Sequence, residues 1–369
     1  MNLKVPYFSL AEQNRALRAE LDAAIGSVID SGAFCLGPEV EAFEREFAAW
    51  NGSRHVIATN SGTAALHLAA RLLKLQPGDE VITTPFTFAA TSWAISYTGA
   101  TPVYVDITPA TYNLDPDQVA AAVTPRTKAI FPVHLYGLPC DIAAIQRVAA
   151  DRGLAVVEDA AQAHGATVDD VKVGNFAPLT AFSFYPTKNL GALGEGGALV
   201  TNDDSFADRA RALRNHGCRE RYRHAEVGYN YRMEGLQGAA LRVKLRHLDT
   251  FNAKRRALAR RYTEHLRGLP LTLPVERPGS RSAWHLYVIR AADRDGLARH
   301  LADRGIGSAI HYPIPLHLQP AYAALGYRAG ALPVAEQASR EVLALPFYPE
   351  MPLEHTDLVS AAIREFFHH

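Results

Sequence analysis

Short apolar runs alternate with amphipathic helical stretches between about residues 55 and 202. The runs are rich in β-branched and aromatic residues, as buried strands are. They cover residues 55–59, 80–84, 102–107, 129–136, 154–160, 181–185 and 197–202. Helical patterns lie between them, for example over residues 63–75 and 141–153, and Gly153 closes the second. This alternation predicts a large α/β domain with a seven-stranded, mostly parallel sheet covered by helices on both faces.

The pattern changes after about residue 203. There follow a helix, a polar arginine-rich loop, a long helix with a bend, a strand, another helix and a proline-rich stretch. These cover residues 205–217, 218–232, 233–268, 284–290, 294–305 and 311–322. Residues 11–30 suggest one amphipathic helix. We therefore divide the chain into residues 1–245, an N-terminal arm with the large domain, and residues 246–369, a smaller α+β domain.

Charge and cysteine content narrow the class of protein. Lys and Arg number 38 and Asp and Glu also number 38, so the formal net charge is zero. A chain without net charge has no long-range electrostatic attraction to nucleic acid or to a membrane, so any anion site must be local. Cys35, Cys140 and Cys218 are odd in number and lack CxxC spacing, which favours a reduced, cytoplasmic compartment. We expect no signal peptide, no membrane span and no metal site.

Ligands of parallel sheets bind at the carboxyl ends of the strands, so the residues where strands stop are informative. After residues 55–59, Ser61, Gly62 and Thr63 open a helix, and the free amides and hydroxyls there suit a phosphate. A simple helix cap explains the same residues. After residues 80–84, Phe86 and Phe88 offer rings for a planar ligand, and core packing is the alternative for one of them.

Two charged strand ends complete the pattern. Glu158 and Asp159 end an apolar run, where a carboxylate needs a positive partner, either a ligand cation or an internal ion pair. Lys188 follows the next run, where an apolar pocket would lower its pKa and favour a Schiff base, although most lysines lie on solvated surfaces. Together, a phosphate grip, an aromatic ring, a carboxylate and a lysine predict a site for pyridoxal 5′-phosphate (PLP). The glycines over 191–197 precede a strand, so they are no dinucleotide fingerprint.

Ordered motifs along nearly the whole chain carry a specific resemblance. They are "LGPEVEAFEREFA" (36–48), "NSGTAALHLA" (60–69), "GDEVITTPFTFAAT" (78–91), "VTPRTKAIFPVHLYG" (123–137), "VVEDAAQAHGA" (156–166), "SFYPTKNLGALGEGGA" (183–198) and "GYNYRMEGLQGAAL" (228–241). On these motifs the chain resembles the DegT/DnrJ/EryC1/StrS family of sugar-nucleotide aminotransferases, which are PLP enzymes of fold type I.

The resemblance implies a role for each matching residue. Lys188 would form the Schiff base with PLP and shuttle the proton, and Asp159 would bind the protonated pyridine nitrogen. The other cofactor contacts would be Gln162 at the 3-oxygen, Phe88 stacked on the ring, and a phosphate site of Gly62, Thr63, Ser183 and, from a second subunit, Asn230. Such a site implies a homodimer with shared active sites. For His164, two interpretations stay open, namely packing in the core and support of the site.

The implied reaction is a ping-pong transfer of an amino group from L-glutamate to a keto sugar nucleotide, with pyridoxamine phosphate between the two halves. Arg219, Arg221, Arg223 and Arg232 lie in a loop with tyrosines that suits an anionic ligand. The resemblance assigns sugar contacts to Arg232, His311, Tyr312 and Tyr185. The "HYP" motif at 311–313 favours a 3-keto sugar. A 4-keto sugar nucleotide, a keto-cyclitol and a non-catalytic PLP-binding regulator stay open as alternatives.

Overall fold

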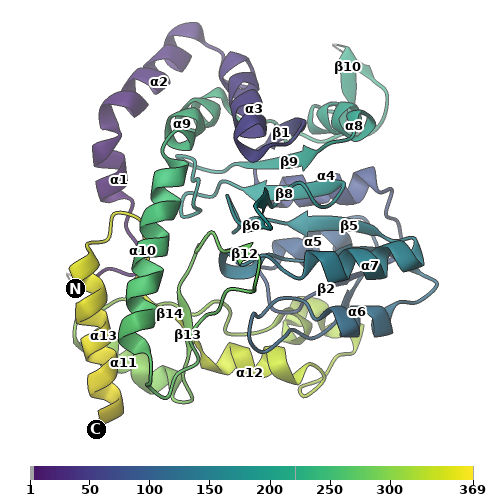
Figure 1. Ribbon diagram of the computed structural model, residues 1–369. Coiled ribbons are helices and arrows are strands. Elements are labelled where there is room, and N and C mark those ends of the chain that lie inside the picture. The colour runs from purple at the N-terminus through teal and green to yellow at the C-terminus, as the bar shows by residue number, and fades with distance from the viewer. Residues whose placement is uncertain (1–3, 221, 369) are drawn as a thin grey trace.

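The computed structural model describes residues 4–220 and 222–368. Its centre is a seven-stranded sheet with the order β1-β9-β8-β5-β4-β2-β3 (Figure 1). The strands are β1 (His55–Thr59), β2 (Glu80–Thr83), β3 (Thr101–Tyr104), β4 (Thr127–Phe131), β5 (Ala155–Asp159), β8 (Leu179–Ser183) and β9 (Gly197–Thr201). Only β9 runs antiparallel to its neighbours in this sheet. The predicted seven-stranded, mostly parallel sheet is therefore confirmed, and each predicted apolar run overlaps one strand.

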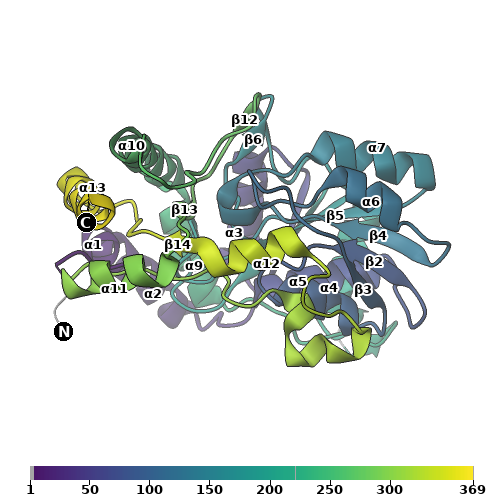
Figure 2. The same ribbon diagram turned by 90° about the horizontal axis from the view of Figure 1, so that it is seen from below.

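Helices cover both faces of the sheet because its buried strands are apolar on both sides. They are α3 (Pro38–Asn51), α4 (Gly62–Leu72), α5 (Ala90–Ser96), α6 (Pro116–Ala122), α7 (Ile142–Arg152), α8 (Asp204–Arg214) and α9 (Gly235–Leu245). Helices α4, α5 and α8 pack on one face through a core that includes Ile57 and Leu179. The neighbouring strand residues Val56 and Phe182 point to the other face, where α3 and α9 pack. Figure 2 shows α6 and α7 on the opposite side of β4 and β5 from α4 and α5.

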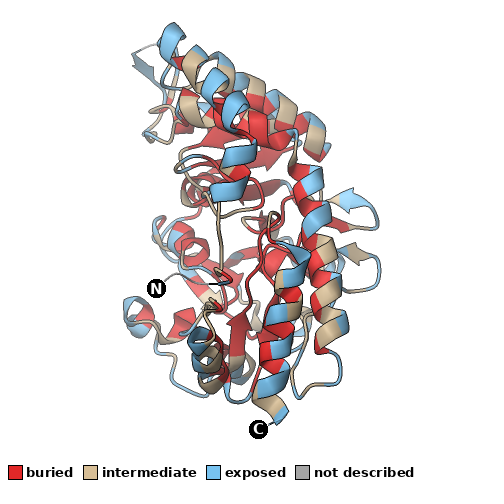
Figure 3. Ribbon diagram, turned by 90° about the vertical axis from the view of Figure 1, so that its left-hand side faces the viewer, coloured by how far each residue is buried: buried red, intermediate tan, exposed pale blue. Residues whose placement is uncertain are grey.

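Much of the last third of the chain packs around a separate hydrophobic cluster, and the rest packs in a cluster shared with large-domain residues such as Phe86 and Tyr136. Its elements are α10 (Leu248–Leu266), β13 (Val288–Arg290), α11 (Arg294–Asp303), α12 (Pro333–Glu341), β14 (Val342–Ala344) and α13 (Leu353–His368), with short 3₁₀ turns at Leu316–Leu318 and Pro320–Leu325. Strands β13 and β14 pair antiparallel. Figure 3 shows that the helices are buried on their inner sides and exposed on their outer sides, as amphipathic helices are.

Some element predictions need correction. Residues 11–30 do not form one helix, because the chain leaves the helical path at Leu17 between α1 (Ala11–Ala16) and α2 (Arg18–Ser31). The long helix is bent as predicted, and it divides between α9 and α10 close to the proposed domain boundary at residue 245. The strand at 284–290 shrinks to its last three residues, β13.

Several short strands were not predicted from the sequence. A three-stranded sheet combines β12 (Ser280–Arg281), β6 (Thr167–Val168) and β7 (Val171–Lys172), and a hairpin joins β10 (Cys218–Glu220) to β11 (Arg223–His224). These strands have two or three residues each, too few for a periodicity to show. Within the described residues, none of the helices has the length and apolar character needed to cross a membrane.

Candidate active site

A cavity of about 550 Å³ opens at the carboxyl ends of the central strands. It brings together most of the residues that the sequence predicted for the site. These are Gly62, Thr63, Phe88, Asp159, Gln162, Ser183, Tyr185, Lys188, His311 and Tyr312. Ser61, which the sequence placed beside Gly62 and Thr63, also lines the cavity, and further walls come from Thr87, Trp93, Glu195 and His285, which the sequence did not indicate. The strand ends therefore converge as a parallel sheet requires.

Lys188 lies in the turn that follows β8, where its main-chain N–H donates to the Tyr185 carbonyl at 2.8 Å. Burial lowers the pKa of the Lys188 amine to about 8, and the negative charge of Asp159 partly opposes this shift. An amine with such a pKa is unprotonated in a much larger fraction near neutral pH than an ordinary lysine. The cavity thus provides the free amine that attack on an aldehyde requires.

Asp159 is the last residue of β5 and its carboxylate lies in the cavity wall. Its Oδ2 accepts a hydrogen bond from Thr91 Oγ1 at 2.7 Å, and its Oδ1 accepts one from the Ala161 N–H at 3.1 Å. Burial nevertheless raises the pKa of this carboxyl, against the opposing effects of these donors and of Lys188. A buried carboxylate in this state gains from a further cation. A protonated pyridine ring meets that need, so this residue fits PLP.

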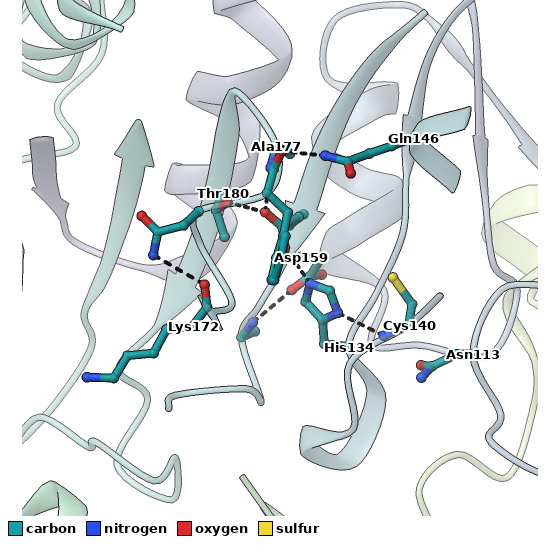
Figure 4. A network of polar contacts seen from close by, with 12 residues as sticks. Asn113, His134, Cys140, Gln146, Asp159, Lys172, Ala177 and Thr180 are labelled. Carbon is teal, nitrogen blue, oxygen red and sulfur yellow. Dashed lines mark hydrogen bonds and ion pairs between the residues drawn. The ribbon is translucent and has the colours of Figure 1, made fainter. Parts of the chain in front are cut away.

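A fully buried network lies behind Asp159 (Figure 4). Glu158, its neighbour in β5, accepts hydrogen bonds from the Ala177 N–H and Thr180 Oγ1, both at 2.9 Å. The Cys140 N–H donates to His134 Nδ1 at 3.1 Å, so His134 uses Nε2–H to donate to Glu158 at 2.9 Å. Burial would raise the pKa of Glu158, but these donors lower it overall.

The two adjacent carboxylates therefore have different environments. Glu158 has the internal partner, whereas Asp159 faces the cavity. The His134 main-chain N–H also donates to the Asp159 carbonyl at 3.0 Å, which ties the network to the cavity wall. Sequence reasoning missed His134 and Thr91, although both lie inside the quoted motifs at 123–137 and 78–91.

The first turn of α4 forms a cradle at the bottom of the cavity. Ser61 caps the helix, because its Oγ accepts from the Ala64 N–H at 3.1 Å. The cap alternative thus holds for Ser61, which nevertheless lines the cavity together with Gly62 and Thr63. A Cβ on Gly62 would lie 2.7 Å from the Ser183 Cβ, so only glycine allows β8 to approach the helix this closely. Free amides at a helix N-terminus beside a serine hydroxyl fit the cofactor phosphate.

Gln162 and the aromatic residues form the remaining wall. Gln162 Oε1 accepts from the Tyr136 N–H at 2.6 Å, and its Nε2 donates to the Tyr312 hydroxyl at 3.3 Å. Phe86 is fully buried in the core, whereas Phe88 keeps 55% of its surface exposed at the cavity. The Phe88 ring is thus free to stack on a planar ligand. His164 packs against other rings in the core and does not line the cavity.

Asn230 and Arg232 are the two predicted site residues that do not line this cavity. They bond to each other, with Arg232 Nε donating to Asn230 Oδ1 at 3.0 Å, and Asn230 is exposed. Two of the loop arginines are paired with acids, Arg219 with Asp208 at 2.6 Å and Arg223 with Glu220 at 3.4 Å, and thus less available to an anion. Arg221 lies outside the described residues.

Comparison with known proteins agrees with this geometry. A family model described as the DegT/DnrJ/EryC1/StrS aminotransferase family matches residues 15–364. The chain is 48% identical over 364 residues to the dTDP-3-amino-3,4,6-trideoxy-alpha-D-glucose transaminase of Streptomyces venezuelae, covering 98% of this chain and 96% of that protein. It is 45% identical to a pleiotropic regulatory protein of Geobacillus stearothermophilus, covering 100% of both. The crystal structure of S. venezuelae DesV in complex with a ketimine intermediate superposes with a TM-score of 0.97 at 48% identity, covering 99% of both chains.

Proposed function

Because the chain belongs to the DegT/DnrJ/EryC1/StrS aminotransferase family and is a PLP-dependent sugar aminotransferase, we propose that it transfers an amino group from L-glutamate to a 3-keto sugar nucleotide. The observation that carries the proposal is the shared cavity of Lys188 and Asp159 at the ends of adjacent strands. When bound, PLP supplies an electron sink for the carbanion that transamination passes through. Residues of the protein hold the cofactor and move the proton.

We assign three tasks to these residues. Lys188 Nζ holds the cofactor in the resting enzyme and, once released, takes the proton from the donor Cα. Asp159 keeps the pyridine nitrogen protonated, with Thr91 fixing the carboxylate. Gly62, Thr63 and Ser183 hold the phosphate, Gln162 approaches the 3-oxygen and Phe88 stacks on the ring. All of these residues line the one cavity, except Thr91, which acts from behind Asp159.

A homodimer with shared active sites is the second part of the proposal. Aromatic side chains stay exposed around the cavity and the adjoining helix α5, namely Phe88 (55%), Trp93 (39%), Tyr97 (58%) and Tyr185 (47%). Exposed apolar surface of this kind is typical of an interface. A second copy would cover it, and the exposed Asn230 and the half-buried Arg232 would then serve the cavity of the partner. The three free cysteines are compatible with the cytoplasmic location that we propose.

The name of the S. venezuelae relative and the motif at 311–313 support a 3-keto sugar. His311, Tyr312 and Tyr185 line the cavity and are the groups we assign to the sugar, together with Arg232 of the partner copy. A 4-keto sugar nucleotide and a keto-cyclitol are the alternatives within the same chemistry.

The test is a visible spectrum of the purified holoenzyme before and after addition of L-glutamate. We expect the absorbance of the lysine-bound cofactor to disappear with glutamate. We then expect a 3-keto sugar nucleotide to restore it, and the matching 4-keto compound to restore it far more slowly. Restoration by the 4-keto compound first would contradict the assignment to carbon 3. A spectrum that stays unchanged with glutamate but changes with another amino acid would contradict the assignment of glutamate as the donor.

A regulatory role is the second candidate, favoured by the name of the G. stearothermophilus relative. A sensor needs neither a proton-transfer lysine nor a carboxylate for the pyridine nitrogen, and this chain has both in one cavity. The same spectrum separates the candidates. A pure sensor would bind PLP and show no conversion with any amino donor.

A further inference from the structure

The N-terminal arm is fixed to the edge of the C-terminal part of the chain. The Val5 N–H donates to the Gly305 carbonyl at 3.1 Å, and the Gly307 N–H donates to the Val5 carbonyl at 2.9 Å. The Phe347 N–H donates to the Tyr7 carbonyl at 3.2 Å. A Cβ on Gly307 would lie 2.6 Å from the Tyr7 nitrogen, so the two segments are in close contact. The arm is therefore an extra strand-like edge with a set position.

This position brings the Tyr7 hydroxyl to a residue of the cavity wall. Tyr7 Oη lies 2.9 Å from Nε2 of His311, and the two ring centroids are 6.0 Å apart. The Tyr136 hydroxyl bonds to the His311 carbonyl, which fixes the main chain at the same point. Burial raises the pKa of Tyr7 and lowers the pKa of His311 to about 4, so both groups are uncharged near pH 7.

We propose that Tyr7 is a positioning residue that sets the tautomer and orientation of His311 in the cavity. Within the described part of the chain, His311 is the one hydrogen-bond partner of the Tyr7 hydroxyl. If the hydroxyl accepted from Nε2–H, its own proton would be left without an acceptor there. The hydroxyl therefore donates to Nε2, and the imidazole proton lies on Nδ1.

The consequence is a defined hydrogen-bond donor for the substrate. An Nδ1–H group presents a proton to an oxygen of the ligand, while Tyr7 prevents the ring from adopting the other tautomer. That the ligand oxygen belongs to a sugar rests on the proposed function. The tautomer itself does not, because it depends only on Tyr7 and His311.

The experiment measures the tautomer of His311 in the full-length holoenzyme labelled with ¹⁵N-histidine. Two-bond ¹H–¹⁵N correlations report it, and the His311→Asn variant assigns the signal. We expect the proton on Nδ1 in the wild type. Tyr7→Phe keeps the ring and removes the donor, so the population should move to the Nε2–H form that a free neutral histidine prefers in water. Tyr262→Phe is the matched control, because it removes a buried hydroxyl that donates to the Pro346 carbonyl at 3.0 Å, and it should leave the His311 signal unchanged.

A wild-type proton on Nε2, or a Tyr7→Phe spectrum identical to that of the wild type, would overturn the proposal. A shift seen in Tyr7→Phe alone supports it, whatever substrate the spectral test identifies. We further expect Tyr7→Phe to slow the second half-reaction about tenfold, and to add nothing in the His311→Asn background. A shifted tautomer with an unslowed second half-reaction would support the positioning by Tyr7 and reject the contact of His311 with the sugar.

Discussion

Lys188 and Asp159 influence each other's protonation across the cavity. Burial lowers the pKa of the lysine to about 8 and raises the pKa of the aspartate, while the charge of each opposes the shift of the other. A cation on the ligand offsets the unfavourable burial of the Asp159 carboxylate. Reaction with an aldehyde uses the neutral amine that the burial of Lys188 favours. The pair is thus arranged for a ligand that carries both groups.

The pKa of Lys188 predicts how the apoenzyme captures PLP. Only the neutral amine attacks the aldehyde, so the capture rate should rise with pH and reach half its maximum near pH 8, well below the ~10.4 of a free lysine. Stopped-flow absorbance measures the rate. Lys188→Ala should show no capture at any pH. Asp159→Asn should move the midpoint to lower pH, because the negative charge that supports the protonated amine is gone. A midpoint above pH 10 in the wild type would contradict the buried environment of the amine.

We expect the free energy of unfolding to fall when the charge of Glu158 is removed. In Glu158→Gln, the amide N–H₂ would face the Nε2–H of His134 or displace one of the bonds to Ala177 and Thr180. A buried donor without an acceptor costs about 1–3 kcal/mol of unfolding free energy. Urea unfolding at pH 7 measures this loss. Glu220→Gln, at an exposed ion pair, is the control and should change stability by less than about 0.5 kcal/mol.

The same variant has a defined pH dependence. The folded-state pKa of Glu158 is lowered, so its contribution is complete above the unfolded value of about 4.3 and is lost as the pH falls through the folded value. The contribution of the Glu158 charge to the difference between wild type and Glu158→Gln should therefore shrink below about pH 4. A difference that grows on acidification would show that Glu158 is not ionised in the fold.

At the scale of elements, the contact between α4 and β8 shapes the phosphate cradle. Gly62→Ala forces a methyl group to 2.7 Å from the Ser183 Cβ, so the helix start and the strand end must move apart. We expect PLP affinity to fall at least about tenfold, because the amides and the serine hydroxyl no longer converge. Equilibrium dialysis or tryptophan fluorescence measures the affinity.

Gly26→Ala is the control for that variant. Gly26 lies inside α2, and a Cβ there meets nothing within 4 Å. This change should leave PLP affinity unaltered and raise stability by about 0.5–1 kcal/mol, since alanine favours a helix. Equal PLP affinities in Gly62→Ala and in the control would remove the cradle from the phosphate site.

The sequence pattern located elements better than it located their ends. Strand β4 stops at Phe131 because Pro132 cannot donate to a ladder, although the apolar run continues to residue 136. The helix break at Leu17 carries no proline or glycine, so no local residue marks it. Helix α2 packs against α9, with Leu17 buried in the cluster that joins them, and such packing partners are invisible in a local pattern.

At the scale of the whole molecule, the proposed dimer predicts complementation between defective variants. Lys188→Ala removes the lysine, and Asn230→Asp places a negative charge where the partner's cofactor phosphate would bind. Refolding equal amounts of the two variants together gives hybrid dimers. In each hybrid, one active site carries both substitutions and the other carries neither. Because about half of the dimers are hybrids, activity should recover to about one quarter of the wild-type value.

Turnover assays on the mixture and on each variant alone measure this recovery. A mixture no more active than the two variants separately would show that Asn230 serves its own chain or no site. Wild type mixed with Asn230→Asp in the same way should keep about half of the wild-type activity whether or not the subunits exchange, so this mixture is the control for activity lost during refolding.

The sequence by itself determined the alternation of strands and helices and the residue types at the strand ends. Those follow from local hydrophobic periods and from motifs that a reader can match in one dimension, so the parallel sheet, Lys188 and Asp159 were accessible. The apolar pattern alone did not separate Glu158 from Asp159 and only the resemblance named Asp159, whereas the tertiary structure shows directly that Asp159 faces the cavity and Glu158 the opposite side of the sheet. It also brought Tyr7 to His311 across 304 positions of chain. Contacts over such distances depend on packing of whole elements, which no local pattern encodes.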